Sequence, residues 1–310
     1  MRRPRALQSG DRVAIVAPAS SFSRDEFDAG IAEVRHLGFE PVFDDSIFER
    51  TATGYLAGSA ERRAAAIRAA WRDPAIAGLI AVRGGYGSAQ VLPLLDPAEA
   101  RAAAKPFIGY SDLTAMLTFL TIHCDLVAFH GPMLDGRLGR GQDGYDRASF
   151  ERVVCRAEAA GEMRAPGIET LHRGDVTGRL FGGTVTQLLA SLGTPYAFNP
   201  PDGYVLFFDE VGERPYRLDR MVTQLRQTGL LGRAAAIVVG ELPRCDEPGG
   251  SLLGRAVMAD VLADFHGPVL MGFPSGHTAG PQMTLPFGVM CRVVADPHHP
   301  TLVIEEAAVQ

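Results

Sequence analysis

Ser111 lies in KPFIGYSDLTAM (residues 105–116), where a short apolar run ends in GYSD and a helical pattern begins. A serine at a strand-to-helix turn has its hydroxyl lifted out of the sheet, and the free N–H groups of the first helical turn can stabilise a developing negative charge. Serine and aspartate are also ordinary residues at a helix N-terminus, and the second glycine of a GxSxG motif is absent here. Ser111 is therefore either a helix cap or a nucleophile.

A nucleophilic serine needs a base and an acid from elsewhere in the chain, because its free hydroxyl is a poor nucleophile. His277 lies in FPSGHTAGP, a loop of small residues that can present an imidazole without burying it, although a histidine in a surface loop is the alternative. Asp209 and Glu210 end the apolar run YVLFF. Since successive side chains of a strand point to opposite faces, only one of these two acids can face a given histidine.

Two glycine pairs follow apolar runs and precede turns or helices. Gly84 and Gly85 lie in VRGGYG, and Gly182 and Gly183 lie in RLFGGTVTQLL. Glycines let the backbone approach a ligand closely, and N–H groups at a helix N-terminus suit an oxyanion or a carboxylate. Either pair can instead be plain turn chemistry. No GxGxxG motif is present, so the sequence gives little support to a dinucleotide site.

The elements that must position these residues alternate between strands and helices in the first half of the chain. The pattern predicts strands at RVAIVA (12–17), EPVFDD (40–45), IAGLIAV (76–82) and KPFIG (105–109), and helices at residues 24–38 and 61–73. Such alternation indicates an α/β fold with a mostly parallel sheet and helices on both faces. Ligands gather at the carboxyl ends of parallel strands, so the RGGYG and GYSD turns are expected to meet there.

The second half has a different pattern, with several short strands and fewer helices. The stretch from about residue 140 to 175 is polar and shows no strong strand signal. We therefore predict an N-terminal α/β domain at residues 1–150, a linker region at 151–174 and a smaller mixed α/β domain at 175–310. The predicted nucleophile belongs to the first domain, and the histidine and the acid belong to the second.

Composition narrows the function classes. With 310 residues, 46% of them apolar, and a formal net charge of −6, the chain predicts a globular protein without the basic surface that nucleic acid or an anionic membrane requires. No window approaches the ~20 apolar residues of a membrane span, and the segment after MRRPR lacks the apolar stretch of a signal peptide. The four cysteines are far apart, and no histidine spacing suggests a metal. These features favour a cytoplasmic protein with reduced thiols and without a metal.

Seven segments together resemble the LD-carboxypeptidase family of serine peptidases, which includes the microcin C self-immunity hydrolases. The resemblance runs nearly end to end and keeps the family's order. Its segments are VAIVAPAS, VRGGYGSAQVLPLLD, FIGYSDLTAML, FHGPM, GRLFGGTVTQLLASLGTP, DEVGERPYRLDRMVTQL and GFPSGHTAGPQMTLPFG.

The resemblance implies a fold, an active site and a reaction. The expected fold has an N-terminal glutamine-amidotransferase-like parallel sheet and a smaller C-terminal domain, with the active site between them. Ser111 is the implied nucleophile, His277 the base, and the backbone amides of Asp112 and of Gly84 or Gly85 the oxyanion donors. The implied reaction is hydrolysis of a small peptide that ends in a D-amino acid, such as the D-alanine of a murein tetrapeptide in peptidoglycan recycling. It needs no cofactor, and a homodimer is the family expectation.

The acid departs from the family pattern, which usually has glutamate followed by aspartate. Here Asp209 stands at the glutamate position and Glu210 at the aspartate position. Aspartate can orient a histidine with a shorter reach, but the run YVLFF is one residue longer than usual, so a bulge could turn Glu210 inward. We favour Asp209 and retain Glu210.

Substrate contacts are less defined than the three candidate catalytic positions. Arg83 adjoins the segment GGYG at residues 84–87, the glycine loop, and is a candidate for binding the substrate's free carboxylate. Gly182 and Gly183 are candidates for substrate contact, although Thr184 stands where the family often has asparagine. An aminoacyl-nucleotide hydrolase of the microcin C type is the alternative function, and it would need an aromatic platform that the one tryptophan, Trp71, does not offer from its Ala-rich helix. A catalytically inactive ligand-binding homologue is a further alternative.

Overall fold

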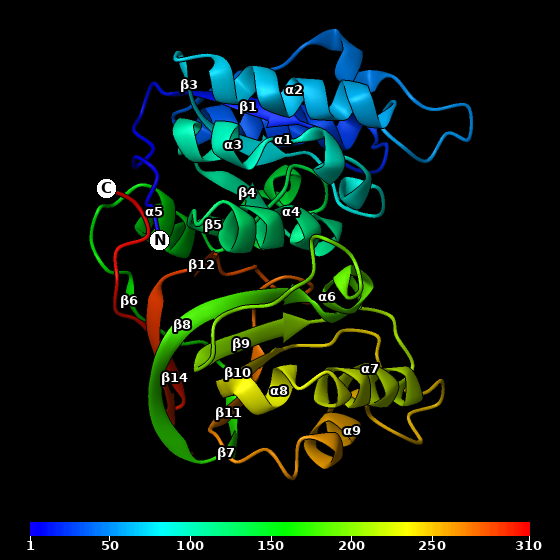
Figure 1. The fold of residues 1–310 in the computed structure, drawn as a ribbon, viewed down its shortest axis with the longest axis vertical. Helices are drawn as coiled ribbons and strands as arrows, with labels where there is room; N and C mark the ends of the chain where they lie inside the picture. Colours follow the sequence, from blue (N-terminus) through cyan, green and yellow to red (C-terminus); the bar gives the residue numbers. More distant parts are fainter.

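The computed structural model describes residues 1–310 as two sheets stacked along the long axis of the molecule (Figure 1). The first half of the chain forms a six-stranded sheet, and most of the second half forms an eight-stranded sheet. Both the α/β class and the predicted parallel sheet of the first half are confirmed. No helix combines the length and the apolar character that crossing a membrane requires.

Five parallel strands and one antiparallel strand make up the first sheet. In spatial order they are β12 (Leu285–Phe287), β5 (Ala128–His130), β4 (Phe107–Gly109), β3 (Ile76–Ala81), β1 (Arg12–Val16) and β2 (Glu40–Val42). The antiparallel strand β12 comes from the second half of the chain and pairs with β5. The chain therefore returns to its first sheet shortly after His277.

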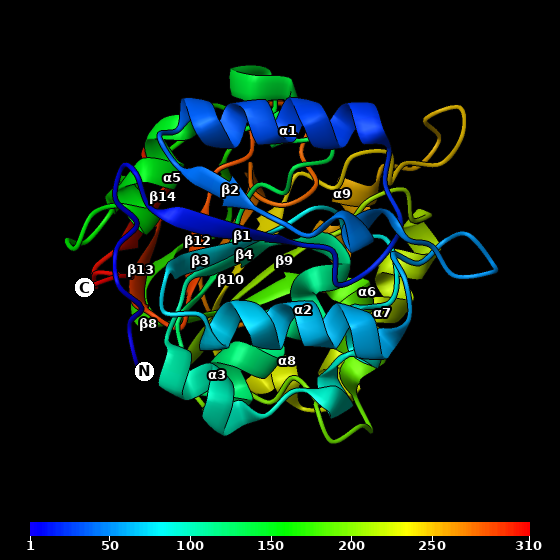
Figure 2. The same ribbon diagram turned by 90° about the horizontal axis from the view of Figure 1, so that it is seen from above.

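Helices cover both faces of this sheet, as the crossover connections between parallel strands require. In Figure 2, α1 (Arg24–His36) lies on one face, and α2 (Ala60–Arg72) and α3 (Pro97–Ala103) lie on the other. The predicted helix boundaries are confirmed to within two residues. Ser59 begins α2 by accepting a hydrogen bond from the Arg62 N–H, and Gly38, with φ of +91°, lies just beyond the end of α1.

The eight-stranded sheet has four parallel strands flanked by antiparallel ones. Its order is β6 (Gly161–Met163), β14 (Thr301–Ile304), β13 (Met290–Ala295), β8 (Gly174–Thr184), β9 (Tyr204–Asp209), β10 (Ala234–Gly240), β11 (Val269–Phe273) and β7 (Glu169–His172). The remaining helices are α4 (Thr114–Thr118), α5 (Arg147–Val154), α6 (Val185–Ser191), α7 (Pro215–Gln227), α8 (Leu230–Arg233) and α9 (Gly254–Val261). Figure 1 shows α4 between the two sheets and α7 to α9 beside the second sheet.

The segment predicted as a linker region, residues 151–174, shows no strong strand signal in the sequence. The segment contains β6 and β7, which are the two edge strands of the second sheet. Both are short and only one of their residues, Met163, is fully buried, so their sequences lack the apolar alternation that marks a half-buried strand. The domain boundaries proposed at residues 150 and 175 stay a prediction.

One hydrophobic core joins the two sheets. Along β9, Val205 and Phe207 belong to the same cluster of 68 buried residues as Val13 and Leu79 of the first sheet. Alternate β9 residues, Tyr204, Leu206 and Phe208, belong instead to a second cluster of 23 residues beneath α7. The side of β9 that carries Val205 and Phe207 therefore faces the first sheet, and the side that carries Tyr204, Leu206 and Phe208 faces α7.

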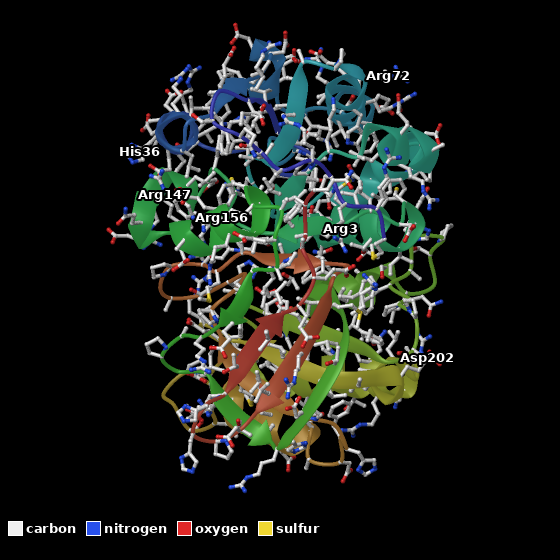
Figure 3. All side chains as sticks on the ribbon, turned by 90° about the vertical axis from the view of Figure 1, so that its left-hand side faces the viewer. Arg3, His36, Arg72, Arg147, Arg156 and Asp202 are labelled. Carbon is white, nitrogen blue, oxygen red and sulfur yellow. The ribbon has the colours of Figure 1, made fainter.

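Charged side chains occupy the outside of both halves. Figure 3 shows Arg72, Arg147 and Asp202 at the edges of the molecule in that view. Arg3 lies at the junction of the sheets in the same view, and its guanidinium contacts Glu306 near the C-terminus at 2.5 Å. This contact joins the N-terminal segment to the C-terminal segment.

Candidate active site

Ser111 lies at a sharp turn between β4 and α4. Its φ of +64° is in the left-handed region that non-glycine residues rarely adopt, as expected for a serine displayed at a strand-to-helix elbow. Its hydroxyl caps neither the 3₁₀ turn that it begins, Ser111–Leu113, nor α4. The hydrogen-bond partner of Ser111 Oγ is His277 Nε2, at 3.1 Å. The geometry therefore differs from that of a capping serine.

His277 is held between Ser111 and an acid. Its Nδ1 lies 2.7 Å from Asp209 Oδ2, and its backbone N–H donates to the same oxygen at 2.6 Å. The imidazole is part-buried, and its ring lies 5.2 Å from that of Tyr110 in an edge-on arrangement. An imidazole with an acid at Nδ1 and a hydroxyl at Nε2 is arranged to take a proton from that hydroxyl.

Of the two candidate acids, the structure brings Asp209 and not Glu210 to His277. The pairing of β8 with β9 runs without interruption from Leu180–Val205 to Thr184–Asp209, so no bulge turns Glu210 inward. Asp209 continues the side of Val205 and Phe207 and faces the first sheet. Glu210 faces the opposite side, where its Oε2 accepts from the N–H and hydroxyl of Thr186 at 3.0 and 2.5 Å.

The carboxyl of Asp209 is fully buried and ionised. Burial raises its pKa, but the charge and the two hydrogen bonds of His277, with a smaller contribution from His130, outweigh burial and bring the pKa down to about 2. The hydroxyl of Thr184 donates to the second carboxyl oxygen, Oδ1, at 2.9 Å. Three hydrogen bonds therefore orient this carboxyl, and its Oδ2 serves His277 alone.

The first glycine pair lies directly against Ser111. A Cβ added to Gly84 would lie 2.9 Å from Ser111 Cβ and 3.2 Å from the backbone nitrogen of Asp112. Gly85 has φ of +89°, and a Cβ there would collide with Ser20 Oγ at 2.5 Å. The N–H groups of Gly84 and Gly85 donate to no acceptor within the chain, which leaves them available to an oxyanion.

Asp112 joins this glycine loop to the serine turn through a pair of hydrogen bonds. Its Oδ2 accepts from the Ser88 N–H at 2.8 Å, and its backbone oxygen accepts from Ser88 Oγ at 2.6 Å. Burial raises the pKa of the Asp112 carboxyl, and the hydrogen bonds from Ser88 oppose that rise. The side chain of Asp112 thus fixes the glycine loop, and the N–H groups of that loop and of Asp112 itself are the predicted oxyanion donors.

The other predicted binding residues have structural contacts of their own. Arg83 is exposed and lies near Asp135, with Nε to Oδ2 at 3.4 Å, while its Nη1 donates to the Ser21 carbonyl at 3.2 Å. Gly182 and Gly183 are buried in β8, where a Cβ would collide with the Phe207 carbonyl oxygen at 1.8 Å and with Thr114 Cγ2 at 2.4 Å. Close packing accounts for both glycines, and their contact with substrate stays a prediction.

Four residues that the sequence analysis did not propose as site residues also shape the site. Ser88 and Thr184 hold Asp112 and Asp209, and Gly276 and Arg137 hold the loop that carries His277. The adjacency of Gly276 to His277 was a usable signal, as was Thr184 at the position where asparagine was expected. Nothing in the sequence around Arg137 points to the site. No group of three or more His, Cys, Asp or Glu side chains is arranged to hold a metal ion.

Comparison with known proteins identifies the family. The family models for the LD-carboxypeptidase N-terminal and C-terminal domains match residues 13–131 and 177–293. The chain belongs to the LD-carboxypeptidase family. It is accordingly a hydrolase of the serine peptidase type, as the sequence predicted.

Relatives within the LD-carboxypeptidase family carry two kinds of name. The murein tetrapeptide carboxypeptidase of Pseudomonas aeruginosa is 32% identical over 86% of this chain and 88% of its own length. The microcin C7 self-immunity protein MccF of Escherichia coli is 26% identical over 90% of this chain and 88% of its own. A solved structure of MccF in complex with glutamyl sulfamoyl guanosine has the same fold, with a TM-score of 0.89 and 23% identity over 99% of both chains.

Proposed function

We propose that this protein is a serine carboxypeptidase that hydrolyses the amide bond between an L-centre and a C-terminal D-amino acid. A murein tetrapeptide that releases D-alanine is the substrate we favour, which implies a cytoplasmic role in peptidoglycan recycling. The observation that carries the proposal is the unbroken hydrogen-bonded series from Ser111 Oγ through His277 to Asp209. The murein carboxypeptidase among the relatives supports the choice of substrate.

In the proposed reaction, Ser111 Oγ attacks the scissile carbonyl while His277 Nε2 takes the hydroxyl proton. The new C–O bond gives a tetrahedral oxyanion, which the N–H groups of Asp112 and of Gly84 or Gly85 stabilise. His277 then gives the proton to the leaving amine, and the C–N bond breaks. A water molecule, activated by the same imidazole, hydrolyses the acyl-enzyme and restores Ser111. Asp209 holds the imidazolium throughout.

Recognition of the terminal carboxylate is assigned to Arg83. Its guanidinium is exposed next to the glycine loop, and its nearest acid, Asp135, is not closer than 3.4 Å. A charge-assisted hydrogen bond from Arg83 to the substrate carboxylate would therefore replace only a long ion pair with Asp135.

A second candidate function is hydrolysis of an aminoacyl-nucleotide, and one feature of the surface supports it. Trp71 is buried in the core and offers no platform, but Tyr55 and Tyr86 are 49% and 52% exposed with ring centroids 6.1 Å apart. Tyr86 directly follows Gly85 in the glycine loop. The two rings are tilted by 45° to each other, so a flat ring bound beside the glycine loop could stack on one of them, for which we favour Tyr86.

The direct test offers both substrates to the purified protein. We expect release of D-alanine from the L,D-tetrapeptide, loss of that activity in Ser111→Ala, and labelling of the wild type by a fluorophosphonate that Ser111→Ala abolishes. Ser21→Ala, which removes a part-buried hydroxyl that donates to the Gly54 carbonyl, is the matched control and should behave as wild type. Cleavage of the aminoacyl-nucleotide alone would favour the second function, and an unlabelled wild type would favour an inactive homologue.

The oligomeric state is a separate proposal. The family resemblance favours a homodimer, so sedimentation velocity should give about twice the monomer mass of 33.2 kDa. A species of monomer mass at micromolar concentration would contradict it.

A further inference from the structure

Arg137 is a buried cation without an acidic partner. Its side chain is 5% exposed, and no carboxylate oxygen lies within ion-pair distance of its guanidinium. All its hydrogen bonds go to neutral oxygens, namely Tyr110 Oη at 3.2 Å and the carbonyls of Gly144 at 3.2 Å, Gly276 at 2.9 Å, Thr278 at 3.1 Å and Gly280 at 3.1 Å. A buried charge is costly unless another charge or a set of oriented dipoles compensates it.

Asp209 is the complementary case, a buried anion without a lysine or arginine partner. Its partners are the two N–H groups of His277 and the hydroxyl of Thr184. The imidazole can compensate this charge fully only when it is protonated. When His277 is neutral, which is the state that can accept a proton from Ser111, the charge of Asp209 needs another source of stabilisation.

One peptide group lies between these two charges. The carbonyl of Gly276 and the N–H of His277 are opposite ends of the same planar unit. Arg137 Nη2 donates to that carbonyl at 2.9 Å, and the N–H donates to Asp209 Oδ2 at 2.6 Å. The negative end of the peptide dipole therefore faces the cation and the positive end faces the anion. Each charge strengthens the hydrogen bond that the other makes.

We propose that Arg137 is the counter-charge of Asp209 and acts through the Gly276–His277 peptide, which makes it a positioning residue for His277. The proposal rests on the proposed function, because it concerns how the histidine is held for reaction with Ser111. Arg137 lies in the first half of the chain, just before the 3₁₀ turn Leu138–Asp143, and the loop that it holds lies in the second half. It therefore fixes the imidazole relative to a serine in the same half as itself.

The glycine before His277 fits the same arrangement. Gly276 has φ of +74°, and a Cβ there would lie 2.2 Å from Asp209 Oδ2. Only glycine lets the peptide approach the carboxyl closely enough to donate to it. Two further carbonyls of this loop, those of Thr278 and Gly280, also bind Arg137, so the guanidinium sets the path of the whole loop.

A double-mutant cycle tests the proposal without relying on any peptide substrate. The variants are Arg137→Met, Asp209→Asn and the pair together, and the readouts are Tm and the rate at which a fluorophosphonate labels Ser111. We expect Arg137→Met to slow labelling by ~10²-fold, and Arg137→Lys, which keeps the charge, to recover about tenfold of that loss. The double variant should melt about 3 °C or more above the value that additive losses predict, since it leaves no buried charge uncompensated.

Lys105→Met is the matched control. Lys105 is also a part-buried cation held by backbone carbonyls, those of Ala70 and Asp73 at 2.7 and 2.6 Å, but it precedes β4 at the end opposite Ser111. This variant should lower Tm and label at the wild-type rate. If Arg137→Met does not fold, Arg137→Gln, which keeps donors without charge, takes its place in the cycle.

Additive Tm losses, or labelling of Arg137→Met at the wild-type rate, would overturn the proposal. If the fluorophosphonate does not label the wild type at all, the proposed function is refuted instead. The double-mutant cycle in Tm would still decide whether Arg137 and Asp209 are coupled. Failure of the function and failure of the inference are therefore distinguishable.

Discussion

Asp209 and Glu210 are adjacent in the chain, yet they lie in different electrostatic surroundings because β9 turns them to opposite faces. Asp209 contacts His277, whereas Glu210 accepts hydrogen bonds from Thr186 and from the N–H of Val211. Burial raises the pKa of the Glu210 carboxyl, and the hydrogen bonds from Thr186 and Val211 oppose that rise. The shorter aspartate reaches His277 because the histidine loop itself approaches β9.

Substituting each acid by its amide should separate their roles. We expect Asp209→Asn to lower kcat by ~10³–10⁴-fold, since an amide at this position favours the wrong imidazole tautomer. Glu210→Gln should change kcat by less than about tenfold, because its contacts are structural. Steady-state kinetics on the L,D-tetrapeptide would measure both, and the reverse order of effects would contradict the assignment of Asp209.

His130 makes stability depend on pH. It is fully buried beside Asp209 and His277, and burial lowers its pKa from 6.5 to about 4. Between these values the unfolded chain binds a proton that the folded protein does not, so stability falls as the pH drops from 6.5 toward 4. At pH 5 the loss is ~2 kcal/mol.

Urea unfolding at pH 7 and pH 5 would measure that loss. His130→Gln should show a smaller difference between the two pH values than wild type, whatever its stability at pH 7. His298→Gln, which changes an exposed histidine, is the control and should keep the wild-type difference. An unchanged difference in His130→Gln would show that other groups cause the pH dependence.

At the scale of elements, the site is built at the carboxyl ends of four parallel strands. The turns after β3 and β4 supply the glycine loop and Ser111, the last residue of β9 is Asp209, and the turn after β11 carries His277. Turns of this kind are precise only where something holds them. For the glycine loop, the hydrogen bonds between Ser88 and Asp112 have that role.

Ser88→Ala should therefore affect the reaction more than substrate binding. The variant loses the hydrogen bond from Ser88 Oγ to the Asp112 carbonyl, which loosens the loop against the serine turn. We expect kcat to fall ~10-fold and KM to change less than about twofold. Ser149→Ala, which removes an equally buried hydroxyl from α5, is the control. A change confined to KM would place Ser88 in substrate binding instead.

At the scale of the whole molecule, the two halves are joined by one core. The larger hydrophobic cluster includes residues of both sheets, and β12 and the chain ends also cross between the halves. Separate unfolding of either half would expose this shared apolar surface to water, which is unfavourable. We therefore expect the two halves to unfold together.

Two probes can check this cooperativity. Trp71, the chain's one tryptophan, is buried in the first half and reports on that half by fluorescence, whereas far-UV circular dichroism reports on both sheets. The two urea transitions should coincide. A fluorescence midpoint that differs from the circular dichroism midpoint would show that the halves unfold independently.

The sequence by itself determined the features that depend on local pattern. Apolar runs and glycines placed β1, β3, α1 and α2 and the turns that carry Gly84 and Ser111, because hydrophobic periodicity and turn chemistry act over a few residues. The order of the motifs gave the family. The short edge strands β6 and β7 were missed, since three or four partly exposed residues carry little apolar alternation.

Only the tertiary structure decided which acid meets His277 and what holds that histidine. Alternation along β9 shows that Asp209 and Glu210 point to opposite faces, but which face contains the histidine depends on how the second sheet packs against the first. Arg137 and the Gly276–His277 peptide come together from segments well over a hundred residues apart in the chain. Such contacts leave no periodic signal in a sequence, because they are fixed by packing between elements and not by the propensity of any one of them.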